Sequence, residues 1–154
     1  MRITAKFLAA ALLASGCNLG AQSSCFLNHL RGTYLGSMTG WFDISALNPA
    51  APPGMAPISC AGSHKLDGAG GGSITMFCNI NGTVLGGDAT ITSTKLNTDC
   101  TGTMDATLNV QGSGAAMPLS VRFLMAPGGA EIHLIAAGKA VWSEQLRRVS
   151  APWQ

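Results

Sequence analysis

Charged and aromatic residues are scarce in this chain: they make up 10% and 6% of its 154 residues. Nine Lys and Arg residues stand against seven Asp and Glu residues, which leaves a net charge of +2. Arg2 and Lys6 alone account for that excess, and no cluster of basic residues follows. Nucleic acids and anionic surfaces are bound through such clusters. We therefore expect no nucleic-acid partner.

The motifs of common reactive sites are also absent. The cysteines form no C-x-x-C pair and have no His at zinc-ligand spacing. The Gly-rich segment 67–72 is not followed by the Lys-Ser/Thr of a phosphate-binding loop, and no single loop gathers enough acidic residues for calcium. The sequence predicts no metal and no cofactor, assigns no catalytic residue, and favours a protein that is not an enzyme.

Long apolar runs are missing as well, since the run Phe7–Ala14 is too short to span a bilayer. It follows the basic residues Arg2 and Lys6 and precedes small residues up to Ala21. This arrangement is typical of a signal peptide. We expect a signal peptide over residues 1–21 and a single domain over residues 22–154, secreted or periplasmic.

A second interpretation of the same segment changes the location. Ala14-Ser15-Gly16-Cys17 resembles a bacterial lipobox, although Leu13 lies one place earlier than the usual pattern prefers. Acylation of Cys17 would make the protein a membrane-anchored lipoprotein, because each buried methylene of an acyl chain contributes about 0.8 kcal/mol. Membrane attachment is expected only in that case.

Four cysteines remain under either interpretation, and an even number in an exported chain predicts two disulfides. A hairpin centred on Ala69 places Cys60 opposite Cys78, which favours that pair and leaves Cys25 to bond with Cys100. In the chain-entropy model the longer loop stabilises the fold by roughly 4 to 5 kcal/mol.

Residues typical of strands and turns dominate the rest, and apolar and polar residues alternate between turn signals. Asn81-Gly82 is a strong hairpin signal, and the Pro-rich segment 48–57 predicts a surface loop. We expect all-β structure: an antiparallel, roughly eight-stranded up-and-down barrel, with a β-sandwich as the alternative. Residues 142–148 could instead form a terminal turn. The expected strands cover residues 33–44, 58–66, 73–80, 88–96, 103–111, 119–125, 131–137 and 139–149, with bends or bulges at Gly36 and Gly40.

Four short segments carry a resemblance to a group of small exported bacterial proteins. They are Gly32-Thr33-Tyr34, Leu66-Asp67-Gly68-Ala69-Gly70, Asp99-Cys100-Thr101-Gly102-Thr103 and Gly128-Gly129-Ala130-Glu131-Ile132. The group resembles calycin-like or allene-oxide-cyclase-like β-barrels and is largely uncharacterised. The resemblance implies a barrel and carries over no catalytic residues, because its motifs are those of turns and strands.

One polar group is a candidate site. With Pro127-Gly128 as the turn centre, Arg122 lies opposite His133, with Glu131 on the same face and Phe123 opposite Ile132 on the other. Such a His could exchange protons or orient a ligand carboxylate. The interpretation that we favour is that this face looks outward and that the residues are ordinary solvated cross-strand partners. His29 and His64 are expected at the surface.

Apolar side chains suggest a function. They either line a cavity or fill the core: Met38, Met76, Met104, Met125, Phe77, Phe123, Trp41 and Trp142. The favoured hypothesis is an exported barrel that binds a small hydrophobic or amphipathic ligand, with Arg122, Glu131, His133, Trp41 and Phe123 as candidate contacts. It predicts a central pocket. The alternative is a structural or interaction protein of the cell envelope with a solid core, and a weaker one is a barrel isomerase or cyclase.

Overall fold

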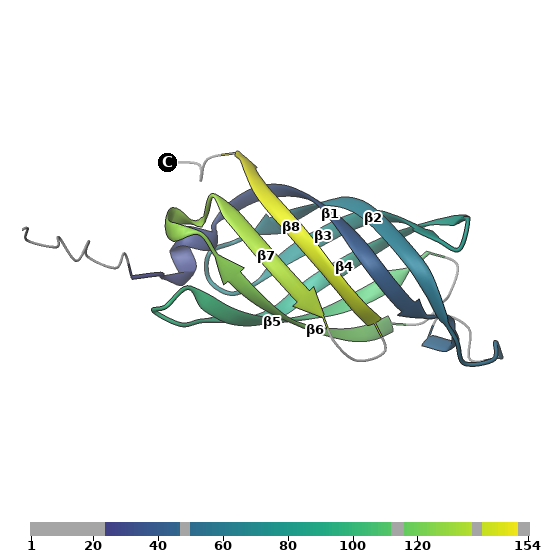
Figure 1. Ribbon diagram of the computed structural model, residues 1–154. Coiled ribbons are helices and arrows are strands. Elements are labelled where there is room, and N and C mark those ends of the chain that lie inside the picture. The colour runs from purple at the N-terminus through teal and green to yellow at the C-terminus, as the bar shows by residue number, and fades with distance from the viewer. Residues whose placement is uncertain (1–23, 47–49, 112–115, 137–139, 151–154) are drawn as a thin grey trace, which may run out of the picture.

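The computed structural model describes residues 24–46, 50–111, 116–136 and 140–150, and these form a closed antiparallel barrel of eight strands. Each strand pairs with the next along the chain, and the last pairs with the first, as Figure 1 shows. The barrel prediction is confirmed and the open sandwich is excluded. The strands are β1 (Gly32–Asp43), β2 (Met55–Leu66), β3 (Gly72–Ile80), β4 (Thr83–Leu96), β5 (Thr101–Val110), β6 (Ala116–Met125), β7 (Glu131–Ala136) and β8 (Ala140–Ser150).

Helical structure in the described residues is limited to three short 3-10 turns: η1 (Leu27–Leu30), η2 (Ile44–Ala46) and η3 (Pro127–Gly129). Within the same residues no helix is long and apolar enough to cross a membrane. The expected signal peptide over residues 1–21 and its residue Cys17 lie outside the described part of the chain.

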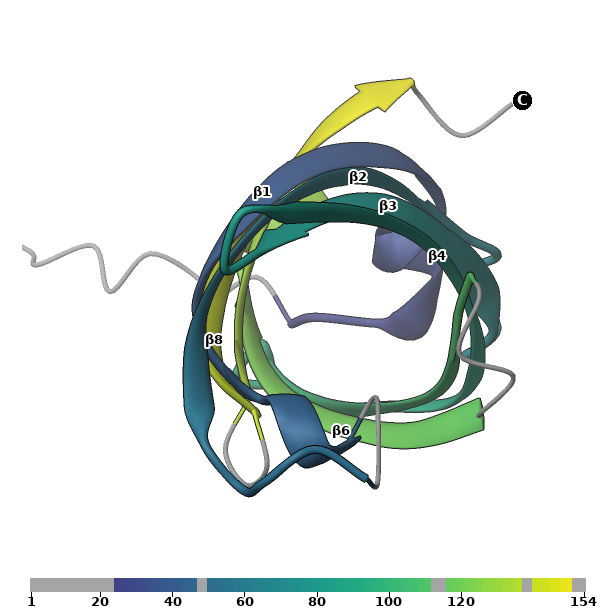
Figure 2. The same ribbon diagram turned by 90° about the vertical axis from the view of Figure 1, so that its right-hand side faces the viewer.

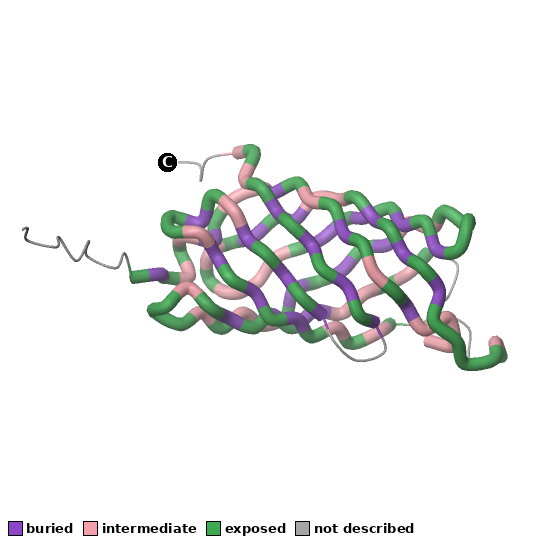
Figure 3. Tube along the Cα trace, viewed as in Figure 1, coloured by how far each residue is buried: buried purple, intermediate pink, exposed green. Residues whose placement is uncertain are grey.

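Burial alternates along the strands, as the banding of Figure 3 shows. In β5, Met104 and Ala106 are buried while Thr103 and Asp105 face outward. Alternate residues of a strand point to opposite faces, so an apolar/polar alternation gives every strand one apolar face. When the sheet closes into a barrel, these apolar faces all turn towards the lumen.

Glycines in β1 allow a close approach to β8. The inward positions Gly36 and Gly40 pair with Leu146 and Trp142, the large inward residues of β8. A Cβ on Gly40 would lie 2.3 Å from the Val141 carbonyl oxygen and 2.5 Å from the Trp142 Cβ. These glycines were expected to mark bends or bulges. The irregularity of this pair of strands instead lies between Thr33 and Tyr34.

The tight turn between β3 and β4 is the one predicted. Ile80 pairs with Thr83 across Asn81-Gly82, and both turn residues have positive φ, 49° and 89°. Such a turn matches the twist of the strands it joins.

The predicted loop over residues 48–57 is too long, because β2 begins at Met55 and includes Pro57. The pairing of β2 with β3 begins only at Ile58, and the Pro57 carbonyl oxygen accepts a hydrogen bond from the Asn81 N–H of the turn. The missing N–H of Pro57 therefore removes no ladder bond to β3.

Residues 142–148, a possible terminal turn in the sequence, form the middle of β8. That strand pairs with β7 on one side and β1 on the other. Closure of the barrel therefore outweighs the weak strand propensity of Glu144, Gln145 and the two arginines.

Both predicted disulfides are present. Cys60 and Cys78 are directly opposite in the β2–β3 ladder and are bonded, and Cys25 is bonded to Cys100 across 75 residues. Two disulfides fit an oxidising environment, extracellular or periplasmic.

One end of the barrel is covered. Tyr34 is fully buried there; its hydroxyl donates to the Gly129 carbonyl oxygen at 2.9 Å and accepts from Arg148 Nη2 at 2.7 Å. Arg148 also donates to the carbonyl oxygens of Gly128 and His29, which ties η3 and η1 together. Burial raises the pKa of Tyr34, against the lowering effect of Arg148. In Figure 2, which looks into the opposite end, η1 lies across the far end of the barrel.

Candidate ligand-binding site

The lumen contains a cavity of about 730 Å³ in the half of the barrel away from η1, and it opens to solvent. Its size is within the range of small-molecule sites, which are concave and mostly apolar. The inward-facing side chains that line it are apolar and come from all eight strands: Met38, Phe42, Ile58, Met76, Cys78, Ile80, Leu85, Leu108, Val110, Met117, Leu119, Ala136, Ala140 and Trp142, with Ala106 between them.

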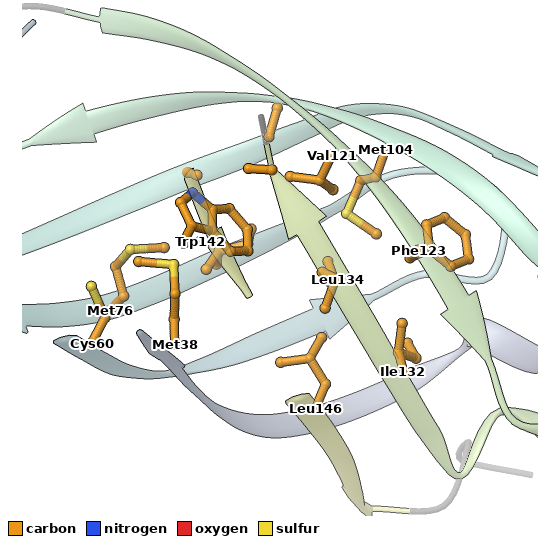
Figure 4. Close-up of a cluster of buried hydrophobic side chains, with 14 of the residues drawn as sticks. Met38, Cys60, Met76, Met104, Val121, Phe123, Ile132, Leu134, Trp142 and Leu146 are labelled. Atoms are coloured by element: carbon orange, nitrogen blue, oxygen red, sulfur yellow. The ribbon is translucent and has the colours of Figure 1, made fainter. Parts of the chain in front are cut away.

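Methionine and tryptophan form the inner wall of this cavity. Figure 4 shows Met38 and Met76 beside the indole of Trp142, and all three line the cavity. Methionine is unbranched and flexible, so it adapts to ligands of irregular shape. Gly40 lets β1 pack closely against the Trp142 backbone in β8, and the buried Trp142 ring points into the lumen.

A buried polar pair lies deeper in the barrel. His64 Nε2 and Glu144 Oε1 are 2.9 Å apart, and the two residues are 2% and 7% exposed. Among the described residues no other acidic or basic side chain is buried. Burying them together is less costly than burying either one alone, because each satisfies part of the other's hydrogen bonding.

The pair borders a second, much smaller void of about 20 Å³. That volume holds one water-sized group. Met76, Ala106, Leu119 and Trp142 line both the void and the main cavity, so the void lies directly beneath the cavity floor. His64 Nδ1 is fully buried, and nothing in the described residues bonds to it.

The predicted pairing of Arg122 with His133 is wrong. His133 pairs with Leu124, Arg122 pairs with Ile135, and Phe123 faces Leu134. Because η3 occupies the turn, the hairpin centre lies between Gly128 and Gly129, one residue later than predicted. A shift of the centre by one residue moves the pairing by two, so every side chain keeps its predicted face.

That face is the outer one. Arg122 and His133 are exposed and Glu131 is partly exposed, with His133 Nε2 3.6 Å from Glu131 Oε1. Glu131 also accepts a hydrogen bond from Gln145 and lies 3.8 Å from Arg147 Nε. These residues form a surface cross-strand network and do not line the cavity.

The two aromatic candidates lie apart from the cavity as well. Trp41 is 53% exposed on the outer face, next to Pro57 and Val141 in the neighbouring strands. Phe123 is buried inside the barrel nearer the covered end, where its ring occupies the space over Gly102. Neither residue borders the main cavity.

Sequence reasoning missed the polar pair because it assigned His64 to the surface. The alternation of each strand contained the signal. His64 shares its parity with the buried Cys60 and Leu66 of β2, and Glu144 shares its parity with Trp142 and Leu146 of β8. Residue type was therefore a poorer guide than position along the strand.

No group of three or more His, Cys, Asp or Glu side chains that could hold a metal ion occurs among residues 24–46, 50–111, 116–136 and 140–150. No model of a known protein family matches the chain, and a search of curated protein sequences found no match. The resemblance to small exported bacterial barrels therefore stays a prediction.

Proposed function

We propose that this protein binds a small hydrophobic or amphipathic ligand inside its barrel. The observation that supports this function is the cavity of about 730 Å³, lined mostly by apolar side chains and open to solvent. Apolar surface gains free energy when it leaves water, about 25 cal/mol per Å². A concave apolar wall is therefore a binding site for apolar molecules.

The cavity supports lumen binding over the alternative of a structural or interaction protein with a solid core. That alternative predicted no space larger than a water or two, whereas the described lumen holds a cavity many times that size. An isomerase or cyclase stays a second candidate, because it requires a polar group inside a pocket. The His64–Glu144 pair borders the small void next to the cavity, and this buried polar pair is the observation that favours that candidate.

A dye titration with matched variants tests lumen binding. N-phenylnaphthylamine is uncharged and fluoresces strongly in apolar surroundings, so it should bind the wild-type protein with an increase in emission. Leu108→Trp places a bulkier side chain in the cavity and should weaken binding, because Leu108 lines it. Asn109→Trp places the same ring on the outer face of the same strand and should leave binding unchanged. Equal loss in both variants, or no binding by the wild type, would refute the function.

We also propose that the protein works outside the cytoplasm, secreted or periplasmic, or anchored through Cys17. The two disulfides and the N-terminal pattern support this location. Mass spectrometry of protein purified from bacteria that express the full chain gives the mature N-terminus. A start at Gln22 indicates a free protein, an acylated Cys17 indicates an anchored one, and an intact Met1 would contradict export.

A further inference from the structure

Only one of the two ring nitrogens of His64 has a hydrogen-bond partner in the described residues. Nε2 bonds to Glu144, while Nδ1 is completely buried with no partner in the described residues. A buried polar atom without a partner is destabilising, so native proteins satisfy nearly all such atoms with protein groups, water or ligands. An occupant of the lumen that reaches Nδ1 would therefore gain a hydrogen bond.

The space for such an occupant is small and has mixed chemistry. The void of about 20 Å³ is bordered by His64 and Glu144 on one side and by apolar side chains elsewhere, among them Ile74 and Leu134. It holds one water-sized group and no more. A Cβ on Gly36 would lie 3.1 Å from Glu144 Oε1, so glycine at this position leaves room for that carboxylate.

The void and the main cavity are separate but adjacent, because they share part of their lining. Met76 and Trp142 line both, so an apolar molecule in the cavity rests on the same side chains that roof the void. The Met76 side chain has three rotatable bonds and can move aside. A polar group at the inner end of the ligand would then meet His64.

A hydroxyl group fits this position best. Imidazole Nδ1 donates or accepts depending on where the ring carries its proton, and a hydroxyl both donates and accepts. We propose that the ligand is amphipathic, with an apolar body in the main cavity and one hydroxyl group in the void. This hydroxyl group hydrogen-bonds to His64 Nδ1. The proposal rests on the lumen-binding function.

The test compares octanol with nonane, which have the same number of heavy atoms, by displacement of bound N-phenylnaphthylamine. The quantity of interest is the ratio of the nonane to the octanol dissociation constant, so that each ligand's own hydration cancels between protein variants. In His64→Leu/Glu144→Leu this ratio should fall by about tenfold relative to the wild type, the contribution of one net hydrogen bond. An unchanged ratio would overturn the proposal.

Met104→Leu is the matched control. Met104 lines the same void without polar atoms, and the substitution nearly conserves volume. It should keep the wild-type ratio, and a loss as large as in the double variant would show that packing, not the hydrogen bond, sets the preference. If the dye does not bind the wild-type protein, the lumen-binding function is refuted, and this inference is refuted with it. If the dye binds and the ratios agree, this inference alone fails.

A measurement on the wild-type protein covers the case in which the double variant does not fold. In a ¹⁵N spectrum of the histidine rings, octanol should shift the Nδ1 resonance of His64 and nonane should not. The exposed His133 ring serves as an internal reference. Equal responses to the two ligands would mean that water, or nothing, fills the void, and would overturn the proposal.

Discussion

At the scale of single residues, the most unusual feature of this chain is an ionisable pair inside an apolar lumen. His64 and Glu144 lie on β2 and β8, 80 residues apart in sequence, and meet only because the barrel closes. Such a pair adds little net stability, since desolvation offsets its attraction. We therefore attribute the pair to the proposed ligand recognition and not to folding.

This view predicts unequal effects of single and double substitution. His64→Leu leaves Glu144 buried without its partner and should lower the free energy of unfolding by about 3 to 5 kcal/mol. His64→Leu/Glu144→Leu removes both polar groups and should lie within about 1 kcal/mol of wild type. Urea denaturation measures both. If the double variant is less stable than the single one, the pair contributes to folding and the argument fails.

Glycine at position 40 has a different role, because it determines how closely β1 approaches β8. Gly40→Ala places a methyl group against the Val141 carbonyl and the Trp142 backbone, so stability should fall by about 2 kcal/mol. Gly54→Ala is the control, since nothing lies within 4 Å of a Cβ there, and it should change little. Thermal unfolding of the two variants compares them. Equal effects would mean that the strands can separate without cost.

At the scale of elements, the β2–β3 hairpin is fixed by its turn. The Asp67 carboxylate accepts hydrogen bonds from the backbone N–H groups of Ala69, Gly70 and Gly71. These N–H groups lower the pKa of Asp67 below its ordinary value of 3.8, with Ala69 the largest cause. This turn also sets the β2–β3 register, which brings Cys60 opposite Cys78.

The lowered pKa gives the hairpin a pH dependence. A carboxyl whose pKa is depressed in the folded state stabilises fully above 3.8 and loses this effect as the pH falls through its folded value. Asp67→Ala should therefore cost about 1 kcal/mol at neutral pH, a modest figure because the bonds are exposed to water. The deficit should shrink in strong acid. Urea denaturation at several pH values measures it, and a deficit that does not change with pH would contradict this role.

The sequence predicted those elements whose signals are local. Asn81-Gly82 specified its turn because both residues accept positive φ, and the hairpin centre at Ala69 specified the Cys60–Cys78 pair. Asp99 likewise accepts a backbone N–H bond from Thr101 within its own turn. In each case a few neighbouring residues determine the geometry.

The errors came where distant parts of the chain decide. The β6–β7 register depends on η3, whose extra turn was not visible in Pro127-Gly128-Gly129. Residues 142–148 form a strand because β1 and β7 lie on either side of them. The alternation of β2 turns His64 inward, but its partner Glu144 comes from β8, on the other side of β1. Local propensity contains none of this information.

At the scale of the whole molecule, the barrel is covered at one end and open at the other. The Cys25–Cys100 bond and the Tyr34–Arg148 cluster hold η1 and η3 over one end, and the apolar cavity opens towards the other. The contacts that cover the barrel and the proposed binding cavity therefore lie in different halves. A change at the covered end should alter folding without altering the cavity.

Removal of the long disulfide tests this separation. Cys25→Ala/Cys100→Ala frees a loop of 75 residues in the unfolded chain and should lower the free energy of unfolding by about 4 kcal/mol. The affinity for N-phenylnaphthylamine should stay within about twofold of wild type at temperatures where the variant is folded. A large loss of affinity in the folded variant would show that the two halves are coupled.

The claim that the lumen is the binding site is tested most directly by methyl NMR of protein labelled at its methionines. Met38, Met76 and Met117 line the cavity, whereas Met55 is on the outer surface and Met125 is buried outside the cavity lining. On addition of nonane, the first three methyl resonances should shift and show contacts to the ligand, while Met55 and Met125 should not. Contacts confined to Met55, or no shift in the three lining methionines, would contradict the account.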